Sequence, residues 1–251
     1  MRRSAAIALG VGSYLLFLLL YFPAQQGLGL ASAVGLDIPV RLDGIQGTLW
    51  SGEAASTSYQ GMPLGRMRWH FKPFGLLLGR LGYRIELQGA GEELTGSVRT
   101  GLGGGYRMEE LAGLLRAERI PSLLGQRQLD LGGSLDLEQL DLAFDGGRLS
   151  EAEGGVRWRD ASLIAPVKLK LGDLQADLSN GENGGIVAEI RDLSGPTGIK
   201  ASANLAEDGN FQFKGLIKPG RNADPGLTTA LKAISRSGPD GSFSVNYSGR
   251  F

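Results

Sequence analysis

The sequence contains no cysteine and only one histidine, His70, in 251 residues. Without cysteine the chain cannot form a disulfide or a thiolate metal site, although this alone does not decide its compartment. Basic and acidic residues number 26 each, so the formal net charge is zero. Because nucleic-acid-binding proteins carry a basic excess that neutralises phosphates, nucleic acid is not expected as a partner.

Motifs for catalysis and metal binding are also absent from the sequence. His70 has no carboxylate two residues away to orient it, and no Gly-x-Ser-x-Gly elbow supplies a nucleophile. Gly101–Gly105 lacks the Lys-Ser/Thr of a phosphate-binding loop. Aspartates without the spacing of known calcium motifs are interpreted as a polar strand face: Asp130, Asp136, Asp141 and Asp145. We therefore predict no enzyme, no cofactor, no metal and no small-molecule substrate, and a periplasmic hydrolase is the least favoured hypothesis.

One long uncharged apolar run is present, Ala5–Phe22, with Arg2 and Arg3 before it and Pro23 after it. As a helix it would rise about 27 Å, close to the ~30 Å hydrocarbon core of a bilayer. The two arginines place the N-terminus in the cytoplasm by the positive-inside rule. We therefore predict a single-pass signal anchor over residues 1–26 in a bacterial inner membrane, with the rest of the chain in the periplasm.

Two alternatives apply to this run. Ala31-Ser32-Ala33 has the small-x-small form of a signal-peptidase site, but the apolar run ends about ten residues earlier and exceeds the usual 7–15 residues of a signal core. A buried helix of a soluble protein is disfavoured because the run has no polar face. An uncleaved anchor is preferred, followed by a connector of small residues over 27–37.

Glycine is abundant, with 41 residues, more than twice the usual share of ~7%. Short alternating segments between these glycines predict many strands with turns and bulges. Met67, Trp69 and Phe71, for example, alternate with basic residues. We predict a mainly β protein, in which the anchor is followed over 38–251 by a large, highly curved antiparallel sheet with one or two short helices.

Several local features refine this prediction. A first strand is expected over Ile38–Leu42, with a turn at Asp43-Gly44, and a single helical turn should begin at Pro73. Met108–Ala117 is predicted as a helix, because its leucines share a helical face and acidic residues occupy its first turn. The leucines just before Glu138 occupy odd-numbered positions and those just after Gln139 occupy even-numbered ones. Because this switch would move them to the other face of a strand, it predicts a bulge or turn at Glu138-Gln139.

Towards the C-terminus, Leu227–Ile234 is expected to form a short helix. A duplication of one β unit, over 38–105 and 128–251, is a further hypothesis, because Gly47–Ala54 and Gly155–Ala161 share Gly-x-x-Trp. Two short matches can also arise by chance. The three tryptophans are expected to anchor the core: Trp50, Trp69 and Trp158.

The strand before Pro73 carries a basic row on one face, made of Arg66, Arg68, His70 and Lys72. A solvated sheet face is the simpler interpretation. The sharper hypothesis is a docking face for an acidic partner or for lipid phosphates.

Two motifs in this region carry a resemblance. They are Gly47-Thr48-Leu49-Trp50-Ser51-Gly52 and Trp69-x-Phe71-x-Pro73-x-x-Leu76-Leu77-x-Gly79-Arg80-Leu81. Together, behind an N-terminal anchor, they resemble the protein N family of the bacterial type II secretion system. The resemblance implies a bitopic inner-membrane protein that is accessory to secretion, has no enzymatic residues, contacts other inner-membrane secretion subunits and lies among membrane lipid. The motif residues transfer only as structural or interaction signatures.

The β region also resembles the AsmA-type proteins in its pattern. This resemblance implies an anchored, curved sheet that bounds a lipid-holding groove, which we retain as the alternative function. It requires an open sheet with a continuous apolar concave face. A closed sandwich packed by the three tryptophans would exclude it.

Overall fold

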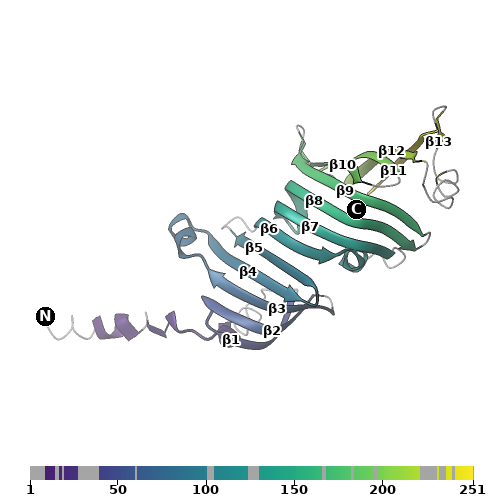
Figure 1. The fold of residues 1–251 in the computed structure, drawn as a ribbon. Helices are drawn as coiled ribbons and strands as arrows, with labels where there is room; N and C mark the ends of the chain where they lie inside the picture. Colours follow the sequence, from purple (N-terminus) through teal and green to yellow (C-terminus); the bar gives the residue numbers. More distant parts are fainter. Residues whose placement is uncertain are drawn as a thin grey trace. The chain divides into compact units, whose positions relative to one another are not determined.

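The computed structural model describes residues 9–14, 17–18, 20–27, 40–59, 61–100, 105–123, 130–165, 168–181, 184–194, 197–220, 231, 236–238 and 241–250. The chain divides into two compact units, residues 1–90 and 91–251 (Figure 1). The described residues are mainly antiparallel β with a few short helices, which confirms the predicted class. Within this described part, no helix is both long and apolar enough to cross a membrane.

The described part of the first unit contains four antiparallel strands that pair in sequence order: β1 (Val40–Gly47), β2 (Ser51–Tyr59), β3 (Met62–Phe71) and β4 (Leu81–Gly89). The 3₁₀ helix η1 (Pro73–Leu78) joins β3 to β4, which confirms the helical turn expected at Pro73. The turn predicted at Asp43-Gly44 is wrong. β1 continues to Gly47 because residues on both sides of Gly44 pair with β2 in one unbroken register, and glycine tolerates the φ of 65° at this position.

The second unit contains longer strands: β5 (Glu92–Thr100), β6 (Tyr106–Arg116), β7 (Asp130–Asp145), β8 (Arg148–Ala165), β9 (Leu169–Asn180), β10 (Ile186–Ser194), β11 (Thr197–Leu205), β12 (Asn210–Pro219), β13 (Arg236–Ser237) and β14 (Phe243–Arg250). They also pair in sequence order, except that β14 lies beside β12 and β13 pairs outside β14. Two short helical segments, η2 (Ala117–Arg119) and α3 (Ile120–Leu123), follow β6. Apart from Leu231, the helix expected over Leu227–Ile234 lies outside the described residues.

The helix predicted over Met108–Ala117 is wrong, because this segment forms β6. Glu110 has a φ of 55°, and the register with β7 shifts between Met108 and Leu111. The bulge is held by the backbone N–H of Glu110, which donates to Oδ1 of Asp141 at 2.6 Å. Side chains on one face of a strand normally lie two positions apart, and an inserted residue makes this interval three. The apolar residues at positions 108, 111 and 115 therefore have a spacing that resembles that of a helix.

The strands of the second unit separate their side chains onto two faces. Directly paired residues point to the same side, and one such row is Leu115, Leu135, Trp158 and Leu174 across β6 to β9. The neighbouring row, on the opposite face, contains Asp136, Arg157, Gln175 and Arg191. The unit therefore has one apolar and one charged face.

A bulge in β7 preserves this separation. The register between β7 and β8 shifts between Glu138 and Asp141, and Gln139 has a φ of 50°. The bulge returns Leu140 to the face that carries Leu137, which confirms the irregularity predicted from leucine parity.

The apolar face supplies the core of this unit. Ala161, Leu174 and Ile199 form a buried cluster, against which Trp158 packs. Trp69 is the buried tryptophan of the first unit, whereas Trp50 and Trp158 are half-buried. Trp50 lies between β1 and β2 and Trp158 lies within β8; the duplication hypothesis stays a prediction.

Candidate functional site

The first motif, Gly47–Gly52, forms the turn between β1 and β2. The backbone N–H of Thr48 donates to the carbonyl oxygen of Ser51 at 2.9 Å. Thr48 Oγ1 accepts from the backbone N–H groups of Trp50 and Ser51 at 3.3 and 3.2 Å. Gly47 has a φ of 94°, and a Cβ there would lie 2.8 Å from Gly52 Cα. The threonine hydroxyl thus closes a turn whose backbone conformation favours glycine.

The second motif packs onto this turn, although Thr48 and Trp69 are 21 positions apart. Trp69 Nε1 donates to the carbonyl oxygen of Thr48 at 3.1 Å, and the backbone N–H of Phe71 donates to that of Trp50 at 2.7 Å. The rings of Trp50 and Phe71 meet edge to face with centroids 4.8 Å apart. A Cβ on Gly52 would lie 2.9 Å from Cε2 of Trp69. The two motifs therefore form one site.

The remaining motif residues shape the connection from β3 to β4. Pro73 begins η1, and Gly79 follows it with a φ of 67°. The backbone N–H of Arg80 donates to the carbonyl oxygen of Gly75 at 2.9 Å, which closes the loop. Beside this connection, burial raises the pKa of the Tyr83 phenol, whose ring lies 5.3 Å from that of Phe71.

The turn also holds the end of the N-terminal segment. The backbone N–H of Leu49 donates to the carbonyl oxygen of Phe22 at 3.1 Å, and Pro23 forms an isolated antiparallel bridge with Thr48. A Cβ on Gly27 would lie 2.8 Å from Leu49 Cγ. The chain that leaves the apolar run is thus seated directly on the first motif.

Burial strengthens this contact. Ala24 is 1% exposed and forms a cluster with Ala54 and Trp69. Sequence reasoning missed Ala24 and Gly27, because no local pattern marks a residue whose partner lies tens of positions away. We call the contact between Phe22–Gly27 and the Gly47–Gly52 turn the N-terminal clamp.

The predicted basic row lies on the face opposite Trp69. Arg68 pairs across the sheet with Glu53 on β2 and with Glu86 on β4, and its Nε lies 3.4 Å from a Glu53 carboxylate oxygen. His70 faces Ser51 and Arg84 on the neighbouring strands. Two carboxylates beside the central guanidinium weaken the field expected of a basic docking face.

The row also contains fewer strand residues than predicted. β3 ends at Phe71, so Arg66, Arg68 and His70 lie on the strand and Lys72 lies beyond it. A shallow hollow of about 310 Å³ beside the row is lined by Gln46, Gly47, Ser51, Gly52, Glu53, Arg68 and His70. Its lining is mixed in charge.

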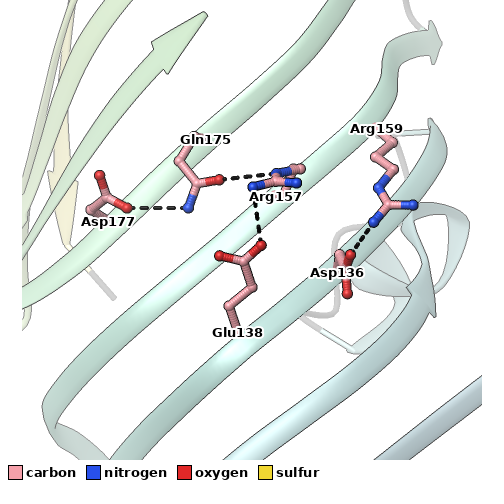
Figure 2. A network of polar contacts seen from close by, with 6 residues as sticks. All are labelled: Asp136, Glu138, Arg157, Arg159, Gln175 and Asp177. Carbon is pink, nitrogen blue, oxygen red and sulfur yellow. Dashed lines mark hydrogen bonds and ion pairs between the residues drawn. The ribbon is translucent and has the colours of Figure 1, made fainter. Parts of the chain in front are cut away.

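The charged face of the second unit carries a ladder of ion pairs (Figure 2). Arg157 contacts Glu138 at 3.2 Å, and Arg159 pairs with Asp136. Gln175 links the ladder onward, since it accepts from Arg157 at 3.4 Å and donates to Asp177 at 3.1 Å. Among the described residues, no group of three or more His, Cys, Asp or Glu side chains could hold a metal ion.

The apolar face of the second unit contains a hollow of about 370 Å³. It is lined by Ile186, Ala188, Ala203, Asn204, Leu205, Phe211, Phe213 and Tyr247. Further along this face, Asp192 lies opposite Leu174, and burial, with a smaller contribution from Asp173, raises the pKa of its carboxyl. An apolar hollow on a sheet can accept an acyl chain or an apolar side chain.

Comparison with known proteins agrees with the motifs. The chain matches the family model described as "Type II secretion system (T2SS), protein N" over residues 39–246. A Vibrio cholerae serotype O1 protein named type II secretion system protein N is 29% identical over 236 residues, which cover 92% of this chain and 91% of that protein. Its Klebsiella pneumoniae namesake is 30% identical over 231 residues, with 88% and 84% covered. The Aeromonas hydrophila namesake is 27% identical over 252 residues, with 97% and 96% covered. No solved structure matches the chain.

Proposed function

Because the chain belongs to the protein N family of the type II secretion system, we propose that it is an accessory, non-enzymatic component of this machinery, anchored in the bacterial inner membrane. The N-terminal segment supports the anchoring. Leu9 is 73% exposed and Phe17 is 61% exposed, and large apolar side chains in such a row favour contact with lipid or protein over water. The strands then lie on the periplasmic side, opposite the cytoplasmic Arg2 and Arg3.

The N-terminal clamp is the observation that carries the proposed role. A long glycine-rich connector would let the strands diffuse freely on a tether. The hydrogen bond from Leu49 to Phe22 and the burial of Ala24 instead fix β1 to β3 at the end of the anchor. A sheet held in this way presents its surface at a constant height above the membrane, which suits contact with other inner-membrane secretion subunits.

A matched pair of glycine variants tests this role. Gly52→Ala places a methyl group against the Trp69 ring, 2.9 Å from its Cε2 atom, whereas a Cβ at Gly198 in β11 meets nothing closer than 3.8 Å. We expect Gly52→Ala to lower secretion of type II substrates when it replaces the wild-type protein, and Gly198→Ala to leave secretion unchanged. Equal secretion by both variants, at equal protein levels, would show that the clamp is not needed.

Crosslinking in cells tests the partners. A photo-reactive residue at Arg66, which is exposed on β3, should capture other inner-membrane secretion subunits. The same residue at Lys214 on β12, also exposed, gives the comparison for the second unit. Normal secretion in a strain without the protein, together with no secretion subunit captured from either position, would contradict the proposed accessory role.

The apolar hollow supports one alternative, a lipid-binding sheet of the AsmA type. Ala203 lies in this hollow, and the adjacent Ser202 points to the opposite face. If the hollow holds lipid, native mass spectrometry of the full chain should find lipid bound to the Ser202→Asp variant and lost from Ala203→Asp. Absence of bound lipid from the wild-type chain would exclude this function.

A further inference from the structure

The connection between β3 and β4 has the composition of a membrane-contacting loop. η1 reads Pro-Phe-Gly-Leu-Leu-Leu and carries no charge. The Phe74 side chain is 83% exposed, and Leu81 at the start of β4 is 46% exposed. Water-facing loops of soluble proteins seldom place large apolar side chains together in this way.

Basic residues flank the same connection. Lys72 precedes η1 and Arg80 follows it. Long basic side chains can lay their apolar stems along a membrane surface while their charged ends reach lipid phosphates. In a bilayer interface, the uncharged apolar centre of such a loop can contact the acyl chains while the cation on each side contacts the lipid headgroups.

The register places this connection at the clamped end of the first unit. Phe71 pairs with Tyr83, so η1 extends beyond this end of β3 and β4. Ser51 pairs with His70, so the β1–β2 turn, which holds Phe22, lies at the same end. Phe22 is the last residue of the apolar run, and η1 therefore lies where the chain leaves the proposed membrane span.

We propose that η1 inserts into the periplasmic interface of the lipid bilayer, with Phe74 among the upper acyl chains and Arg80 at the phosphates. The proposal rests on the anchoring proposed above. It gives the first unit a second attachment to the membrane, so that β1 to β4 cannot rotate freely about the anchor. A protein partner is the competing occupant, but it would not explain why the apolar loop and the N-terminal clamp occupy one end of the sheet.

The cysteine-free sequence makes this proposal directly testable. Single cysteines at Phe74, Ser56 and Val11 would carry a bimane fluorophore in the full chain. The protein would be placed in nanodiscs of phosphatidylethanolamine and phosphatidylglycerol, with or without lipid spin-labelled near its headgroup. Ser56 is exposed on β2, about 17 Å along the strand from Ser51, and it serves as the matched water-facing position.

We expect the spin label to quench the fluorophore several-fold more strongly at position 74 than at position 56. Equal quenching at these two positions would overturn the proposal and would favour a protein partner for η1. Position 11 reports separately on the anchor. Lack of quenching at position 11 would contradict the proposed membrane anchoring, whereas quenching at 11 without quenching at 74 would contradict only the insertion of η1.

Discussion

The two units bury their apolar surface in different ways. In the first unit, Trp69 packs with Ala54 from the sheet and with Ala24, which belongs to the N-terminal segment. In the second unit, one cluster comes from strands alone, namely Ala161, Leu174 and Ile199, and a smaller one joins Phe243 of β14 to Leu231, which lies outside the strands. The described core of the first unit therefore depends on a segment from outside its sheet, whereas the larger cluster of the second unit is built by its own long strands. Substitutions that disrupt the N-terminal clamp should therefore destabilise the first unit and leave the stability of the second unit unchanged.

Charged side chains also pair on the polar faces of both units. In the second unit, ion pairs between β7 and β8 continue to β9 through hydrogen bonds of Gln175, and in the first unit Arg68 pairs with Glu53. Exposed ion pairs each contribute only about 0.2–1 kcal/mol, so the ladder selects strand register more than it adds stability. The larger free energies lie in the buried clusters.

Trp69→Ala should strongly destabilise the first unit and leave the second unit unchanged. It removes a buried indole from the cluster with Ala24 and Ala54 and a hydrogen bond to Thr48. Losing a buried aromatic side chain typically costs about 3–5 kcal/mol in unfolding free energy. Hydrogen exchange of the full chain should become faster in β1 to β3 and stay unchanged in β7 to β9.

An exposed aromatic provides the control for this variant. Tyr247 in β14 is 65% exposed, and Tyr247→Ala should alter exchange in neither core. If Trp69→Ala accelerated exchange in both units equally, the two units would unfold as one cooperative body and not independently.

The sequence alone predicts the strands of both units better than it predicts their contacts. Alternation such as Met67, Trp69 and Phe71 is local, and β3 follows from it directly. The bulge near Gln139 was also predictable, because it is the only way to keep the leucines of β7 on one face. At Glu110 a bulge misled the prediction, because the extra residue in β6 gives its apolar side chains a helix-like spacing.

The candidate site was predictable in its residues and not in its geometry. Trp69 and Gly52 stand out in the motifs, but nothing in the sequence indicates that the indole covers Gly52 and donates to Thr48. Ala24 has no distinctive pattern at all, because its burial depends on residues of β2 and β3. Likewise, Glu53 neutralises part of the basic row only because register places it beside Arg68.

Thr48→Val should weaken the first unit by a smaller amount. Valine keeps the shape of threonine but removes the oxygen that accepts from the N–H groups of Trp50 and Ser51. A lost hydrogen bond of this kind costs about 1 kcal/mol. Chemical denaturation followed by tryptophan fluorescence should show a lower midpoint, and Thr48→Ser should restore the wild-type value. A valine variant as stable as wild type would show that the hydroxyl does not hold the turn.

Asp192→Asn tests the apolar face of the second unit. Burial and Asp173 raise the pKa of the Asp192 carboxyl above its ordinary value of 3.8. The folded state therefore favours the protonated form, and the stability from this group is present below the unfolded pKa and is lost as pH rises through the folded pKa. Asparagine does not titrate, so the variant should be more stable than wild type at neutral pH and should lose that advantage in acid. Thermal unfolding at several pH values measures both effects, and parallel pH profiles for the two proteins would contradict this expectation.

Glu138→Gln should have the smallest effect, because it changes only the charged face. The Glu138 and Arg157 side chains are 45% and 40% exposed, and water already screens their contact. We expect a change in unfolding free energy of less than about 0.5 kcal/mol in ordinary salt. Gln175 also accepts from Arg157, so the guanidinium keeps a partner on β9 after the substitution. Urea denaturation in low and high salt gives the measurement, and a loss above about 1 kcal/mol would mean that the ladder stabilises the second unit as strongly as a buried contact does in the first.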